Sequence, residues 1–155
     1  MLPIEQIHPL VVHFPIVFAL SLALFDAIAV RRGSAIGGRS AVANTSAGLA
    51  ACAGVAAAVA FLFGDMALDV AVAKGTPLSV LETHEELGTA TAIVLSIWGA
   101  LRIALRWRGV ELVRSRATAV VIVQIAIALL LVTTAYFGGQ LVYEFGVGVN
   151  HNSIQ

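Results

Sequence analysis

Long apolar runs separated by short polar segments are the dominant pattern of this chain. Four stretches, at residues 9–30, 41–63, 85–105 and 117–137, are mostly apolar, and each reaches the roughly 20 residues that a helix needs to cross the hydrocarbon core of a bilayer. Lipid cannot satisfy the backbone polar groups of an isolated strand, so each stretch predicts a helix. Because the connections are short, the pattern predicts one all-α transmembrane domain over residues 1–155, an integral membrane four-helix bundle with up-down topology.

The composition agrees with a membrane protein. Of the 155 residues, 59% are hydrophobic and 12% are charged, whereas soluble domains are about 45–50% apolar and about 25% charged. The net charge is zero, so nothing in it indicates a nucleic-acid partner. The single cysteine, Cys52, excludes an intrachain disulfide. The first apolar run has no basic residues before it, so we expect a retained span and not a cleaved signal peptide.

Basic residues lie almost entirely on one side of the predicted bundle. Only Lys74 follows the second span, while the other eight of the nine basic residues follow or end the first and third spans. Cytoplasmic loops of membrane proteins are enriched in Lys and Arg. The bias therefore predicts a multi-pass protein of the cytoplasmic (inner) membrane with both termini outside. We expect Arg102 to extend along its helix to the interface, and Asp26 to be a paired polar group close to Arg31.

All four histidines fall at the opposite, outer end of the predicted bundle. His8 and His13 begin the first span, His84 precedes the third span, and His151 follows the fourth. His13 lies deepest in the apolar zone, where an ionisable residue by default faces the bundle interior and has a partner. Alternatively, a neutral His13 donates a hydrogen bond to a backbone carbonyl left free by Pro15, which has no N–H of its own.

Small and acidic residues near the histidines have both structural and functional interpretations. Glu85 and Glu86 suit the first turn of a helix, which would leave His84 at the membrane surface. The second span is rich in Ala and Gly, so it predicts close helix packing or the flat wall of a cofactor pocket. Gly138 and Gly139 near the end of the fourth span likewise suggest a close helix contact or a break.

The two ends of the chain resemble a known family. The opening run Ile7-His8-Pro9-Leu10-Val11-Val12-His13-Phe14-Pro15-Ile16, followed by Asp26, resembles the start of the bacterial membrane family called domain of unknown function 2231. The closing run Gly138-Gly139-x-Leu141-Val142-Tyr143-x-x-Gly146-x-x-Val149 is similar to its ending, and His84 matches a histidine that begins the family's third helix. The resemblance covers nearly the whole chain and implies a four-helix membrane protein. Fusion of some members to cytochrome or rubredoxin-like domains implies electron transfer. The chain departs from the family at Glu85-Glu86-Leu87-Gly88, where an asparagine is more usual.

The histidines lead to three hypotheses of function. Haem iron takes imidazole as an axial ligand, and bundles place such ligands on facing helices. The leading hypothesis is therefore a small membrane redox module that binds haem b through His13 and His84, with His8 as a further candidate, and passes electrons to a partner protein. The first alternative is a transition metal ion held by His8, His13 and His84 with Asp65 or Glu85. The second is a structural or partner-binding membrane subunit. Enzymatic activity and oligomeric state stay open.

Overall fold

The computed structural model describes residues 4–149, which form five α-helices and no strand. They are α1 (Ile4–Val11), α2 (His13–Arg31), α3 (Ala41–Ala73), α4 (Leu78–Trp107) and α5 (Arg114–Tyr143). A break of one residue separates α1 from α2, which together form the first span. Pro15 explains this break, because it has no N–H to bond the carbonyl four residues earlier.

Four helical segments are long and apolar enough to cross a membrane. They are Gln6–Arg31, Ala41–Ala73, Leu78–Trp107 and Arg114–Tyr143. This result confirms the predicted all-α architecture with four apolar helices. The third segment begins directly after Pro77, so its start lies seven residues before the predicted Glu85 and places His84 inside a helix. The expectation that Glu85 and Glu86 form the first turn of that helix is therefore wrong.

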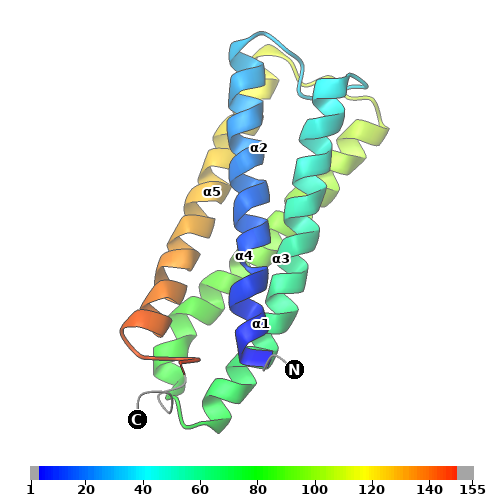
Figure 1. The fold of residues 1–155 in the computed structure, drawn as a ribbon. Coiled ribbons are helices and arrows are strands. Elements are labelled where there is room, and N and C mark those ends of the chain that lie inside the picture. Colours follow the sequence, from blue (N-terminus) through cyan, green and yellow to red (C-terminus); the bar gives the residue numbers. More distant parts are fainter. Residues whose placement is uncertain (1–3, 150–155) are drawn as a thin grey trace.

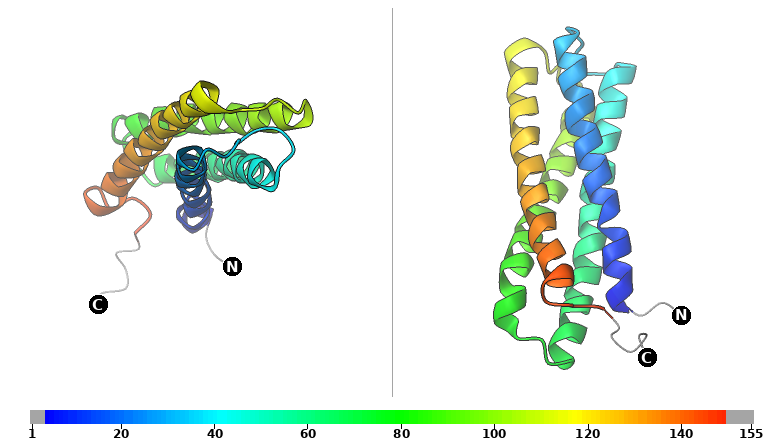
Figure 2. Two further views of the ribbon diagram at one scale, coloured as in Figure 1. Left: turned by 90° about the horizontal axis from the view of Figure 1, so that it is seen from above. Right: turned by 60° about the vertical axis from the view of Figure 1, so that its left-hand side comes forward.

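The helices form two antiparallel hairpins that pack into an up-down bundle (Figures 1 and 2). α2 and α3 make the first hairpin, and α4 and α5 make the second. Within residues 4–149, the backbones of α2 and α4 do not approach each other closely, nor do those of α3 and α5, so each of these pairs lies diagonally across the bundle. The connections 32–40 and 108–113 meet at one end of the bundle, which we call the loop end. There the backbone N–H of Ile36 donates to the carbonyl of Leu112 at 3.1 Å.

The two hairpins meet most closely where α3 packs against α4. A Cβ atom added to Gly99 would lie 2.7 Å from the carbonyl oxygen of Ala50, and one added to Gly54 would lie 2.9 Å from that of Leu95. Both distances are too short for a real side chain, so the helix backbones touch at these glycines. The small residues of the second span therefore provide the close helix packing that the sequence predicts.

A buried polar cluster crosses the bundle diagonal near the loop end. Asp26 on α2 and Arg102 on α4 form an ion pair of 2.9 Å, and both side chains are almost completely buried. Gln124 on α5 donates to the same carboxylate oxygen at 3.0 Å. Arg102 also donates to the carbonyl of Ile36 at 3.1 Å and to the hydroxyl of Ser46. The cluster thus ties all four spans and one loop together.

This cluster corrects two expectations. The predicted extension of Arg102 to the membrane interface is wrong, because its guanidinium turns inward to the carboxylate on the diagonal helix. Asp26 is a paired polar group, as expected, but its partner is Arg102 and not the nearby Arg31. An inward arginine is favoured because a buried carboxylate without a cation would be far more costly than the pair.

Candidate cofactor site

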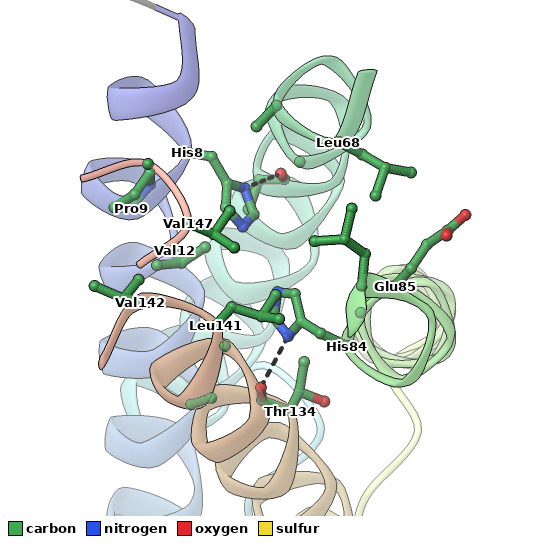
Figure 3. A pocket seen from close by; sticks show the side chains of 18 of the residues that line it. His8, Pro9, Val12, Leu68, His84, Glu85, Thr134, Leu141, Val142 and Val147 are labelled. Carbon is green, nitrogen blue, oxygen red and sulfur yellow. Dashed lines mark hydrogen bonds between the residues drawn. The ribbon is translucent and has the colours of Figure 1, made fainter. Parts of the chain in front are cut away.

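A cavity of about 1150 Å³ lies at the end of the bundle opposite the loop end, which we call the histidine end. Residues of all five helices line it. The segment 145–149, which follows α5, also lines the cavity, and Val147 lies near His8 in Figure 3. Most of the lining is apolar or small, and its polar residues include three histidines and three charged residues: His8, His13, His84, Asp65, Lys74 and Glu85.

The ring of His8 is fixed from α1 against α3. Its Nδ1 lies 3.0 Å from the carbonyl oxygen of Ala60. A carbonyl only accepts hydrogen bonds, so Nδ1 must carry the proton and Nε2 of the neutral ring keeps a free lone pair. Gly64 follows Ala60 by one helical turn, and a Cβ there would lie 3.0 Å from Cε1 of the His8 ring. The glycine therefore makes room for the imidazole beside the helix.

The ring of His84 is fixed in the same way from α4 against α5. Its Nδ1 lies 3.1 Å from the carbonyl oxygen of Thr134, which again leaves Nε2 unprotonated. Gly138 follows Thr134 by one turn, and a Cβ there would lie 2.8 Å from Cε1 of the His84 ring. The hydroxyls of Thr134 and Thr91 lie 2.8 Å apart and hold the two helices in register beneath the ring.

The two imidazoles meet across the cavity. Their ring centres are 6.3 Å apart and their planes are inclined at 71°. Figure 3 shows that the Nδ1 atoms point outward to their carbonyls, so the two Nε2 atoms face each other. This arrangement brings together two nitrogen donors from diagonally opposite helices.

A family model described as "Predicted membrane protein (DUF2231)" matches residues 5–151. The chain belongs to this family. The resemblance seen in the sequence is thereby confirmed over nearly the whole chain. Comparisons with curated proteins and with solved structures give no match.

The predicted site residues of this DUF2231 chain divide into two groups. His8 and His84 face each other, whereas His13 begins α2 with an exposed side chain that lines the cavity without joining the pair. His8 lies on α1 and is half-buried, whereas His13 follows the break between α1 and α2 and is exposed. His151 lies outside the described residues.

The acidic candidates do not complete a metal site among the residues that the structure describes. Asp65 and Glu85 line the cavity but have exposed side chains. Residues 4–149 contain no group of three or more His, Cys, Asp or Glu side chains close enough to share a metal ion. Within the part of the chain that the structure describes, the cavity therefore offers two facing imidazoles without a third potential ligand grouped with them.

Sequence reasoning missed the residues that hold the imidazoles. Gly64 was not singled out, and Gly138 was expected to contact a neighbouring helix instead of a histidine ring. No neighbouring atom lies within 4 Å of a Cβ added to Gly139, so the close contact belongs to Gly138 alone. In each case a glycine lies one turn after the residue whose backbone carbonyl accepts the hydrogen bond from the imidazole. This glycine could not be recognised from the sequence, because any residue type can supply a backbone carbonyl.

Proposed function

We propose that this DUF2231 protein is a membrane redox module that holds one haem b between His8 and His84 and passes electrons to a partner protein. The observation that carries the proposal is the pair of unprotonated Nε2 atoms facing each other with ring centres 6.3 Å apart. Imidazole is the axial ligand that the protein supplies in many haem sites.

The spacing of the rings suits a metal ion between them. A metal–imidazole bond is about 2.0 Å long, and a ring nitrogen lies about 1.1 Å from its ring centre, so two imidazoles on opposite sides of one ion have centres about 6 Å apart. The observed 6.3 Å agrees with this value. Both rings are also oriented by hydrogen bonds from Nδ1 to a carbonyl, which is the usual support of a ligating histidine.

The number of protein ligands favours haem over a bare metal ion. Zinc sites use three or four protein ligands, whereas residues 4–149 offer a facing pair and no group of three. A haem brings four equatorial nitrogens of its own, so two imidazoles complete its coordination. The cavity of about 1150 Å³ is slightly larger than most small-molecule sites, which span roughly 300–1,000 Å³, so it has room for a large planar cofactor.

Coordination by two histidines supports electron transfer more than chemistry at the iron. Both axial positions would be taken by the protein, so no site would remain for oxygen or a substrate. The two rings are anchored to helix backbones and not to loops, which would keep the ligands in place when the charge on the iron changes. A partner protein would supply or accept the electron at the histidine end.

The membrane placement in this proposal follows from charge. Eight of the nine basic residues lie at or near the loop end, and Lys74 lies at the histidine end. We infer that the loop end faces the cytoplasm, which places the histidine end and both termini at the outer surface of the inner membrane.

Absorption spectroscopy of purified protein tests the proposal. Protein produced with an adequate haem supply should have a Soret band and low-spin α and β bands, and His8→Ala and His84→Ala should each abolish them. His13→Ala should retain the bands, since His13 does not face the pair. Loss of the bands in His13→Ala with retention in His8→Ala would refute the assignment of ligands. Bound copper, zinc or iron without a Soret band would favour the metal-ion alternative, and absence of any cofactor would favour a structural subunit.

A further inference from the structure

The second hairpin repeats the burial pattern of the first. Each of the seven buried positions of α5 (117, 121, 124, 127, 128, 131 and 134) has a buried counterpart in α3, 74 residues earlier (43, 47, 50, 53, 54, 57 and 60). The same offset relates Ala60 to Thr134, whose carbonyls receive the two imidazoles, and Gly64 to Gly138. Any two helices that bury the same face could share a burial pattern by chance. Such a coincidence would not also place the two acceptor carbonyls and the two glycines at equivalent positions.

The first helices of the hairpins correspond in the same way. His8 and His84 are 76 residues apart, and so are Asp26 and Arg102, which form the buried ion pair. The same offset relates Ile36 to Leu112, and these two residues are bonded to each other in the paired loops. Equivalent residues thus meet each other at three levels along the bundle.

When equivalent residues of the two hairpins contact each other, an approximate two-fold axis passes between them. The helices α2 and α4 run in the same direction on one diagonal, and α3 and α5 run back on the other, so the axis runs along the bundle (Figure 2). The facing imidazoles lie on either side of this axis. Whatever binds between them meets two similar halves of one site.

We infer that the site is built from two copies of one ligand-holding hairpin, and that Gly64 and Gly138 are its positioning residues. Each copy consists of an imidazole from the first helix, a carbonyl on the second helix, and a glycine one turn beyond that carbonyl. The glycine lets the ring come close enough for Nδ1 to donate to the carbonyl, and that bond turns Nε2 toward the axis. The inference extends the proposed function. Of the two experiments below, only the one that measures haem depends on that function.

Alanine at either glycine displaces one ring and leaves the fold intact. The added Cβ would lie 3.0 Å from the His8 ring or 2.8 Å from the His84 ring, and in both cases the neighbouring atoms belong to a side chain that can turn away. Each substitution should therefore weaken one bond from Nδ1 to a carbonyl and act only on the histidine of its own hairpin. Gly48→Ala is the matched control, because no atom lies within 4 Å of a Cβ at Gly48.

Nitrogen-15 NMR of the cofactor-free protein in detergent micelles measures this directly. At a pH at which imidazole is neutral, His8 and His84 should both carry the proton on Nδ1 in the parent and in Gly48→Ala. Gly64→Ala should shift His8 toward the tautomer with the proton on Nε2, and Gly138→Ala should do the same to His84 alone. The inference is overturned if either variant leaves its own histidine unchanged or alters both histidines alike. This readout needs no haem, so it stands even where the proposed function fails.

Electron paramagnetic resonance of the ferric protein gives the second readout. Imidazole planes inclined at 71° are closer to perpendicular than to parallel, and rings held at this angle on a bound haem would keep the two iron d orbitals that overlap with them close in energy. The parent should therefore give a low-spin signal dominated by one very large g value. Gly64→Ala and Gly138→Ala should each shift this value, while Gly48→Ala should not. If both glycine variants bind haem and give the same signal as the parent, the positioning role is refuted but the haem site is not.

Discussion

Removing the arginine of the buried cluster should destabilise the protein strongly. Arg102→Met deletes the only cation that contacts the Asp26 carboxylate among the described residues. It also leaves the carbonyl of Ile36 and the hydroxyl of Ser46 without this donor. Breaking a buried ion pair by removing one partner costs about 3–5 kcal/mol, so the free energy of unfolding should fall by that amount.

A double-mutant cycle separates the pair from its surroundings. Asp26→Asn should cost a similar amount, because it leaves the Arg102 charge buried without a counter-charge. The variant that carries both substitutions should be more stable than the sum of the single effects by about 3 kcal/mol, since neither charge then remains unpaired. This difference between the double variant and the sum of the single variants is the coupling energy, and it measures the interaction between Asp26 and Arg102.

Unfolding of the detergent-solubilised protein by sodium dodecyl sulfate, followed by circular dichroism, measures these energies. Arg106→Met is the matched control one turn along the same helix, because Arg106 makes an exposed contact with Asn44 worth at most about 1 kcal/mol. The reasoning is refuted if Arg102→Met is no less stable than Arg106→Met, or if the two single effects simply add in the double variant.

Two further predictions concern packing and topology. Gly99→Ala should lower the thermal unfolding midpoint of the purified protein, because its Cβ would lie 2.7 Å from a backbone oxygen. Gly48→Ala should not lower it, because the space around Gly48 is open. Equal midpoints for the two variants would contradict the close approach of α3 and α4. Reporter fusions after Gln155 and within the loop 108–113 should report opposite compartments, with the loop in the cytoplasm. Two fusions on the same side would contradict a bundle of four spans.

The sequence predicted the number of apolar spans and their helical structure because length and apolarity alone decide whether a segment can cross a bilayer. It could not predict which face of each helix points inward. Lipid and core are both apolar, so a membrane helix lacks the polar stripe that reveals the phase of a soluble helix. The choice between His8 and His13, five residues apart, depended on that phase. Depth in the apolar run favoured His13, whereas the ring that faces His84 is that of His8.

The polar cluster was hidden for a different reason. Arg102 is followed by Arg106 and Arg108, so the basic residues together indicated the end of a span and a cytoplasmic loop. The structure places Arg106 and Arg108 at the end of α4, next to the loop, but Arg102 points into the bundle, because a carboxylate on the diagonal helix accepts its hydrogen bond. The shared spacing of 18 residues from His8 to Asp26 and from His84 to Arg102 was present in the sequence, but it becomes meaningful only when the two hairpins are seen side by side.

The ion pair between the hairpins also constrains how the protein is made. Among residues 4–149, the hydrogen-bond partners of Arg102 all belong to the first hairpin or its loop; they are Asp26, Ile36 and Ser46. A nascent second hairpin entering an empty bilayer would carry an unpaired arginine into lipid, at a cost of about 2.5–3.5 kcal/mol on insertion scales. Because synthesis runs from the N-terminus, these acceptors enter the membrane first, and we expect the second hairpin to insert against the first one.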